Sequence, residues 1–216
     1  MFYEKIHLLT MKKDINTVPH RRLNILTGEW ILVSPHRTNR PWQGKTEKSA
    51  AEKQPEFVAS CYLCPGNTRN GGEKNPDYKG PYSFFNDYPS LLPDTLEASY
   101  QNGLLNAETE SGICKVVCFS PDHSLTLPVM EVEEIKKVVQ LWKQEYIELG
   151  GTPNINYVQI FENKGDMMGC SNSHPHGQIW SQRSIPTEIL KKSQHFRDYW
   201  KKHKRSLLED YLKQEL

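Results

Sequence analysis

The chain has 216 residues with 27 Lys or Arg and 26 Asp or Glu, and its formal net charge of +1 excludes a polybasic nucleic-acid binder or an acidic tail as a description of the whole. Its 7 Phe, 10 Tyr and 5 Trp predict a packed core, and no run approaches the ~18 apolar residues that span a bilayer. The N-terminus lacks a signal-peptide pattern, and five cysteines, an odd number, argue against a disulfide framework. We therefore expect one cytoplasmic domain over residues 1–216, with neither membrane nor nucleic acid as a partner.

The first predicted element is a β-hairpin over residues 22–34. Two β-rich runs flank Thr27 and Gly28 there, and glycine adopts the positive φ that tight turns need. Residues 43–57 and 67–81 are polar or rich in Gly, Pro and Asn, which predicts surface loops. Four apolar runs predict strands at 82–86, 113–119, 156–161 and 176–182.

The strongest helical pattern covers residues 131–149, with Gly150 and Gly151 as a stop signal. Its apolar residues recur every three or four positions: Val132, Ile135, Val138, Val139, Trp142 and Tyr146. A second amphipathic pattern predicts one long helix from Thr187 to Leu216. These elements together predict an α+β fold, in which a mainly antiparallel, twisted sheet packs against helices.

Cys61 and Cys64 form a C-x-x-C motif, whose two-residue gap lets both thiolates reach one metal ion. Zinc takes four nitrogen or sulfur ligands, and His123 and His174 are candidates for the other two positions. The alternative is that both cysteines are ordinary buried thiols. A redox pair is disfavoured, because no βαβ pattern surrounds the motif. The rival thiols, which we expect in the core because they lie on an apolar strand, are Cys114 and Cys118.

His174, His176 and Gln178 alternate along the last predicted strand, so their side chains share one face of it. Gly177 would let a substrate approach the backbone, and the small-residue loop 163–171 could cradle phosphate oxygens. A neutral imidazole suits attack on phosphorus when the leaving group is a phosphate, which needs no proton. Gln178 could donate a hydrogen bond to a phosphoryl oxygen as charge builds there. The pattern favours this chemistry over a purely structural histidine pair.

Five stretches, in order along nearly the whole chain, resemble the galactose-1-phosphate uridylyltransferases, a branch of the histidine-triad superfamily. The stretches are HRTNRPWQG at 36–44, CYLCPGN at 61–67, FFNDYP at 84–89, FENKG at 161–165 and GCSNSHPHGQ at 169–178. The resemblance implies a histidine-triad-like half-barrel. It also implies a ping-pong enzyme of galactose metabolism that transfers UMP from UDP-glucose to galactose 1-phosphate.

The resemblance also implies roles for individual residues. His176 would be the nucleophile that carries UMP, and Gln178 would assist the transferring phosphoryl group. The residues implied to contact the UDP-sugar are Arg37, Arg40, Asn70, Asn86, Asp87, Asn163, Gly169, Ser171 and Gln178. Asn70 departs from the family pattern, in which an apolar residue is expected at this position.

The zinc ligands that the resemblance implies are Cys61, Cys64, His123 and His174. Four protein ligands leave no open coordination position, so the zinc would be structural. Lys192 stands where some family members place a glutamate that binds a second metal, and we therefore expect no second metal through that position.

The family's chains are longer, with a second, related half, so the resemblance places this chain in the N-terminal part. An exposed sheet edge would favour self-association, and we expect a homodimer. Two alternatives remain open. The chain would be a zinc-stabilised UDP-sugar-binding fragment without turnover, or a histidine-triad hydrolase or phosphorylase. Gln178 argues against the hydrolases, which usually place a third histidine there.

Overall fold

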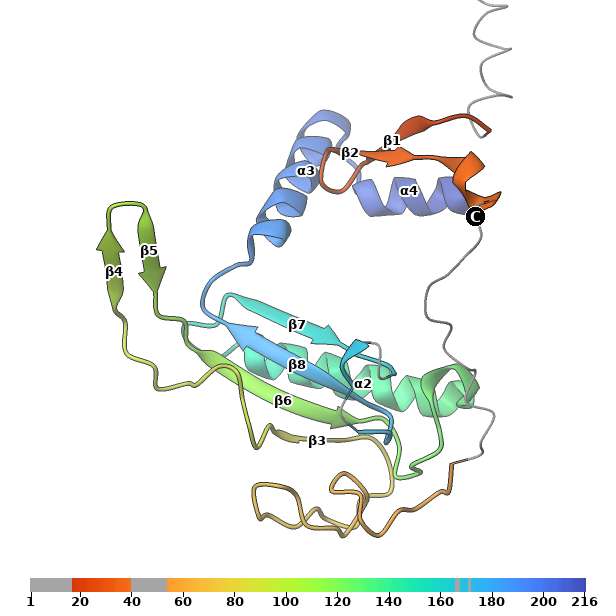
Figure 1. Cartoon of the computed structure of the whole chain (residues 1–216), viewed down its shortest axis with the longest axis vertical. Coiled ribbons are helices and arrows are strands. Elements are labelled where there is room, and N and C mark those ends of the chain that lie inside the picture. The colour runs from red at the N-terminus through yellow and green to blue at the C-terminus, as the bar shows by residue number, and fades with distance from the viewer. Residues whose placement is uncertain (1–16, 40–53, 166–167, 171) are drawn as a thin grey trace, which may run out of the picture. The chain divides into compact units, whose positions relative to one another are not determined.

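The computed structural model describes residues 17–39, 54–165, 168–170 and 172–216 (Figure 1). The chain divides into two compact units. The smaller unit combines residues 1–48 with 186–216, and the larger comprises residues 49–185. The larger unit contains the four predicted strands that follow the hairpin, and it carries most of the predicted site residues.

The larger unit is built on a four-stranded sheet in the order β3-β6-β8-β7, in which every pair is antiparallel. Its strands are β3 (Tyr82–Phe85), β6 (Gly112–Cys118), β8 (His176–Gln182) and β7 (Tyr157–Phe161). All four predicted strands are confirmed to within one or two residues. The α+β class and the mainly antiparallel sheet are confirmed with them. Strands that are not consecutive in sequence lie side by side in the sheet, as β3 and β6 do. This order is possible because long connections carry a loop or a helix across the sheet.

Helix α2 (Val132–Gly150) packs on one face of this sheet and confirms the helix predicted over 131–149 (Figure 1). Val138 and Leu149 of the helix form a core with Val117, Phe119 and Ile179. Gly151 follows as the C-cap, as the stop signal predicted. The apolar stripe is narrower than the sequence pattern indicates, because three of its members are exposed: Val132, Val139 and Tyr146. A helix that packs on a sheet through one line of contact buries only the residues along that line.

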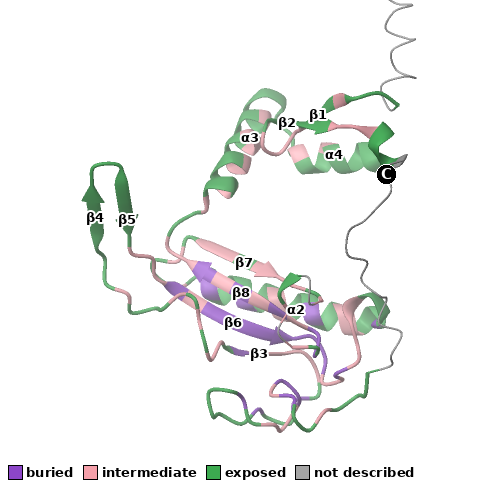
Figure 2. Cartoon of the chain, viewed as in Figure 1, coloured by how far each residue is buried: buried purple, intermediate pink, exposed green. Residues whose placement is uncertain are grey.

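The opposite face of the sheet is covered by the loop over residues 54–81, which forms a second core. Leu63 and Tyr78 of the loop pack there against Phe84 and Val116 of the strands. Strand β6 is therefore buried on both faces, since Val116 faces the loop and Val117 faces α2. Figure 2 shows β6 buried along most of its length, whereas β8 alternates between buried and half-buried positions. The two strand cysteines expected in the core are buried: Cys114 and Cys118.

The sequence reading missed a second hairpin, formed by β4 (Ser99–Asn102) and β5 (Leu105–Glu108). All eight strand positions are exposed, so no apolar alternation marked them (Figure 2). The local signal was Gly103 after Asn102, because glycine at the first position of a two-residue loop supplies the positive φ that a tight hairpin needs.

The smaller unit contains the predicted hairpin, with β1 (His20–Asn24) antiparallel to β2 (Glu29–Val33), followed by η1 (Pro35–Asn39). Gly28 takes a φ of +73° in its turn, and an added Cβ would meet the His195 ring at 2.6 Å. No described helix is both long and apolar enough to cross a membrane.

The prediction of one long helix from 187 to 216 is wrong. The structure has two helices there, α3 (Thr187–His203) and α4 (Leu207–Glu215). Lys204 takes a left-handed conformation that ends α3, and the Ser206 hydroxyl accepts from the Glu209 main-chain N–H to cap α4. The amphipathic period continues across this break, so periodicity alone does not reveal it.

Candidate active site and metal centre

Four side chains from three separate segments of the chain meet on the loop-covered side of the sheet. Cys61 and Cys64 come from the loop before β3, His123 follows β6, and His174 precedes β8. Their ligand atoms all lie within 4.8 Å of one another, and all four residues are buried. The structure thus brings together the four predicted ligands in a group that could hold a metal ion.

Hydrogen bonds orient both imidazoles of this group. Nε2 of His123 lies 2.9 Å from the Ser173 hydroxyl, and Nε2 of His174 lies 3.0 Å from the main-chain oxygen of Ser120. The Nδ1 atoms of both rings face Cys64, each 3.5 Å from its Sγ. Histidine ligands in metal sites characteristically donate their other N–H to an oxygen in this way.

Burial shifts the ionisation of the group. It lowers the pKa of His174 to about 4 and lowers the pKa of His123 from its ordinary value. Burial also raises the pKa of the Cys64 thiol to about 11. At neutral pH both imidazoles are therefore uncharged and have a lone pair to donate. The thiol would release its proton only in exchange for a cation.

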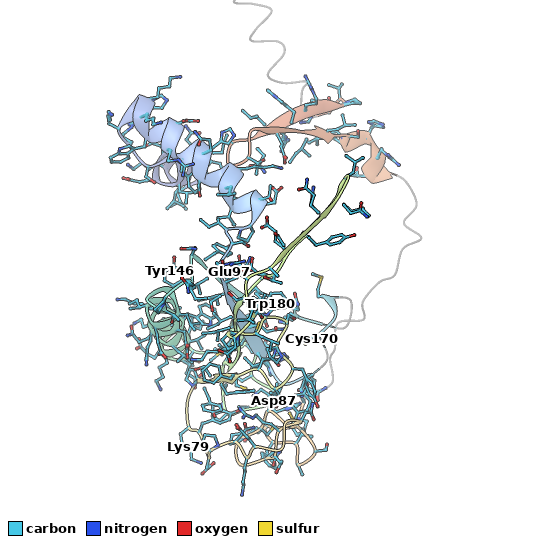
Figure 3. All side chains as sticks on the ribbon, turned by 90° about the vertical axis from the view of Figure 1, so that its left-hand side faces the viewer. Lys79, Asp87, Glu97, Tyr146, Cys170 and Trp180 are labelled. Carbon is cyan, nitrogen blue, oxygen red and sulfur yellow. The ribbon has the colours of Figure 1, made fainter. Side chains whose placement is uncertain are left out.

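A pocket of about 230 Å³ opens on the same side of the sheet. Five predicted site residues line it: Asn70, Asn86, Asp87, His176 and Gln178. The remaining lining residues are mostly apolar or aromatic: Tyr62, Leu63, Phe84, Tyr88 and Val116. Figure 3 shows Asp87, Cys170 and Trp180 on this side and Tyr146 of α2 on the other. A cavity in which polar groups converge beside apolar and aromatic side chains is typical of a small-molecule site.

The orientation of His176 is fixed by the segment that directly precedes its strand. Its Nδ1 lies 2.7 Å from the main-chain oxygen of His174. A carbonyl oxygen only accepts hydrogen bonds, so Nδ1 is the donor and holds the ring proton. Nε2 is then the nitrogen with a free lone pair on a half-buried residue that lines the pocket.

Among the described residues of the larger unit, two predicted substrate contacts are absent from the pocket lining. Asn163 and Gly169 lie in the connection between β7 and β8. Arg37 is exposed on η1 in the smaller unit. Arg40 and Ser171 lie outside the described residues. All nine substrate-contact assignments remain predictions, those of the pocket-lining residues included.

The structure reveals a buried cation that the sequence reading missed, Arg69. Its Nε lies 3.5 Å from Oδ1 of Asp87, and its guanidinium stacks over the Phe84 ring at 4.3 Å. The Gly71 main-chain N–H donates to the other Asp87 oxygen at 3.2 Å. The Asp87 carboxylate is therefore held in place by one contact to each of its two oxygens. No sequence signal marked Arg69, because it lies within an irregular, polar loop.

The interpretation of Gly177 as room for substrate is wrong. A Cβ at this position would lie 2.8 Å from the Phe161 main-chain oxygen and 3.0 Å from the Phe119 ring. Successive residues of a strand face opposite sides, so Gly177 points away from the face of His176 and Gln178. Its small size allows close packing with the strand β7 backbone and the α2-side core.

The fold and site define an α+β protein with a buried Cys/His group beside a pocket that contains a histidine. Residues 9–186 match the family model described as "Galactose-1-phosphate uridyl transferase, N-terminal domain". The chain belongs to this family. It is 49% identical over 199 residues to a galactose-1-phosphate uridylyltransferase of Haemophilus influenzae, and the aligned region covers 92% of this chain and 56% of the relative. It is 43% identical over 215 residues to the Saccharomyces cerevisiae enzyme of that name, and the aligned region covers 94% of this chain and 59% of the relative.

Solved structures show the same fold. The crystal structure of an ADP-glucose phosphorylase from Arabidopsis thaliana with bound ADP-glucose matches with a TM-score of 0.63 at 24% identity, covering 88% of this chain and 56% of that one. A structure described as a uridylyltransferase matches with a TM-score of 0.59 at 25% identity, covering 87% and 53%. The named sequence relatives are uridylyltransferases, which are nucleotidyltransferase enzymes. The chain spans somewhat more than half the length of the curated relatives it matches.

Proposed function

We propose that this chain transfers UMP from UDP-glucose to galactose 1-phosphate in a ping-pong reaction, through a uridylylated His176. The observation that carries the proposal is the 2.7 Å hydrogen bond between His176 Nδ1 and the His174 main-chain oxygen. It leaves Nε2 as the nucleophilic nitrogen of a residue that lines the pocket. The names of the sequence relatives support the overall reaction.

In the first half-reaction, Nε2 of His176 forms a bond to the α-phosphorus of UDP-glucose. The bond from that phosphorus to the bridging oxygen breaks, and its electron pair leaves with glucose 1-phosphate. The Nδ1 proton stays on the ring, whose developing positive charge faces the His174 carbonyl dipole. A phosphate oxygen of galactose 1-phosphate then attacks the same phosphorus. The N–P bond breaks, UDP-galactose forms, and the imidazole returns to its neutral state.

The remaining pocket residues would bind and stabilise the nucleotide. The Gln178 amide would donate a hydrogen bond to a non-bridging phosphoryl oxygen as it gains charge. The further proposed UDP-sugar contacts are Arg37, Arg40, Asn70, Asn86, Asp87, Asn163, Gly169 and Ser171. The described pocket volume of about 230 Å³ holds only part of a nucleotide sugar, so residues outside its lining would complete the site.

We propose that the metal is a structural zinc ion held by Cys61, Cys64, His123 and His174. Tetrahedral bonds of 2.3 Å to sulfur and 2.0–2.1 Å to nitrogen place two such ligands about 3.5 Å apart. Cys64 Sγ lies 3.5 Å from each imidazole Nδ1, which supports this geometry. Four protein ligands would fill the coordination shell, so the metal would stabilise the fold. Through His174 it would also anchor the start of β8.

We further propose that residues 1–216 act as one N-terminal domain of a uridylyltransferase and that the protein functions as a homodimer. Strands β3 and β7 form the two edges of the four-stranded sheet, and sheet edges favour pairing with further strands. A cytoplasmic location is supported by five cysteines without a disulfide, which suit a reducing compartment.

The test is the intact mass of the protein after mixing with UDP-glucose and no acceptor. We expect an increase of one UMP unit that peptide mapping assigns to His176, and its loss on adding galactose 1-phosphate. Bound UDP-glucose without an adduct would contradict the transfer and indicate a binding fragment. Continuous release of free UMP without a sugar phosphate would instead indicate a hydrolase.

A further inference from the structure

Trp180 lies two residues beyond Gln178 on β8 and contacts its side chain. The indole Nε1–H donates a 2.9 Å hydrogen bond to Oε1 of Gln178. Both side chains are half-buried. Gln178 lines the pocket, whereas Trp180 is not among the lining residues. Figure 3 shows Trp180 on the side of the sheet opposite α2, the side on which Asp87 also lies.

This hydrogen bond decides which end of the Gln178 carboxamide remains available. The indole nitrogen is a donor with no acceptor capacity, so it binds the oxygen end and never the amino end. The Nε2 amino group of Gln178 is then left to donate elsewhere. An amide turned the other way would present its oxygen lone pairs to a phosphoryl oxygen, which repels them more strongly as its negative charge grows.

Packing fixes Trp180 in turn. Its ring meets the Phe161 ring edge-on, with centroids 5.6 Å apart and an angle of 79° between the planes. Phe161 is the residue on β7 that pairs with Gln178, and buried Cys114 on β6 pairs with Trp180. An aromatic side chain has only two rotatable bonds, so once these contacts hold it, donating a hydrogen bond costs little further entropy.

We propose that Trp180 is a positioning residue for uridylyl transfer, which holds the Gln178 carboxamide with its amino group free for the phosphoryl group. The inference rests on the proposed function of His176 and Gln178. The same arrangement then occurs twice, because the side chains of His176 and Gln178 are each oriented by a residue two positions away. The His174 oxygen fixes the ring of His176, and the Trp180 N–H fixes the amide of Gln178.

The experiment is a single-turnover measurement of UMP-adduct formation at saturating UDP-glucose, which reports the chemical step. Trp180→Phe keeps a six-membered aromatic ring at this position and removes the N–H together with the rest of the indole's five-membered ring. We expect it to form the adduct about fivefold more slowly, the effect of one net hydrogen bond. In a Gln178→Ala background the same substitution should cause no further slowing, because no amide remains to be oriented. The dissociation constant for UDP-glucose should not change, since the Gln178 contact strengthens only in the transition state.

Trp142→Phe is the matched control. Its Nε1 is buried without a hydrogen-bond partner among the described residues, and it lies in the core on the α2 side. Its adduct should form within twofold of the wild-type rate. A Trp180→Phe rate within twofold of wild type would overturn the inference. Equal slowing by Trp180→Phe with and without Gln178 would also overturn it, because that pattern indicates a structural role.

A second measurement separates this inference from the proposed function. Hydrogen exchange of the Trp180 indole N–H, assigned by its absence in Trp180→Phe, should be slow in the wild type and faster in Gln178→Ala. Unchanged exchange in Gln178→Ala would overturn the hydrogen bond on which the inference depends. If the wild type forms no adduct at all, the proposed function fails, and the exchange rates still decide whether Trp180 holds the amide.

Discussion

The Nδ1 atom of His176 lies 2.7 Å from the main-chain oxygen of His174, which joins the proposed nucleophile to one member of the buried Cys/His group. His174 presents Nδ1 to that group and its carbonyl to His176, so one residue serves both sites. A bound metal would therefore hold the backbone that orients the nucleophile. The two functions are adjacent because alternate residues of an extended strand share a face.

His176→Gly should abolish UMP transfer and leave metal content unchanged. The substitution removes the nucleophile, while all four members of the Cys/His group remain. Adduct formation by mass and metal content by elemental analysis measure the two effects. His203→Ala, which removes an exposed histidine in α3, is the control and should transfer UMP at the wild-type rate. Retained transfer in His176→Gly would refute the nucleophile assignment.

Cys61→Ser should lower metal content and stability together. Losing a structural metal belongs to the class of substitutions that cost about 4 kcal/mol or more, and each kcal/mol corresponds to about 2–4 °C in Tm for a chain of this size. Cys114→Ser is the matched control, because Cys114 is equally buried but lies outside the group. It should keep the metal. If Cys61→Ser binds as much metal as the wild type, Cys61 is not a ligand.

Glu145→Leu should lower the free energy of unfolding by about 3–5 kcal/mol, because it leaves the buried Lys115 ammonium without its partner. Lys115 Nζ lies 2.6 Å from Oε2 of Glu145, and the Ser83 hydroxyl donates to the other carboxylate oxygen. This buried network joins β3 and β6 to α2. The double variant Lys115→Met with Glu145→Leu should recover most of the loss, since it buries no charge.

The control for the buried Lys115–Glu145 pair is an ion pair on the surface. Lys136 and Glu133 form an ion pair at the same 2.6 Å distance, with both side chains in solvent. Lys136→Met should therefore change the free energy of unfolding by no more than about 0.5 kcal/mol. Urea unfolding of all four proteins makes the comparison. An equal effect of Glu145→Leu and Lys136→Met would show that burial of the first pair has no energetic consequence.

Gly177→Ala should destabilise the protein by about 1–3 kcal/mol and slow UMP transfer. Its Cβ would meet a main-chain oxygen at 2.8 Å, so β8 must shift, and the shift moves His176 and Gln178. Gly80→Ala is the control, because no atom lies within 4 Å of its added Cβ and its φ is not in the left-handed region. Thermal unfolding and the adduct rate measure the effects. Wild-type values for Gly177→Ala would show that β8 tolerates the displacement.

Local sequence patterns determined much of the fold. The strands at 82–86, 113–119, 156–161 and 176–182 and the helix at 131–149 were all predictable, because side-chain periodicity and turn residues act within a few positions. The exposed hairpin at 99–108 lacked apolar alternation and was missed. The break at Lys204 was missed because the amphipathic period continues across it.

The candidate site likewise has some features that the sequence predicts and others that only the fold reveals. The C-x-x-C spacing and the alternation of His174, His176 and Gln178 are local, so the sequence by itself determined that each segment presents ligands or reactive groups on one face. Only the tertiary structure decided that His123 is the fourth member of the Cys/His group and that Arg69 forms an ion pair with Asp87. These contacts join the irregular loop over residues 54–81 to sheet segments farther along the chain. Their geometry depends on how that loop packs across the sheet, and no short sequence period encodes that packing.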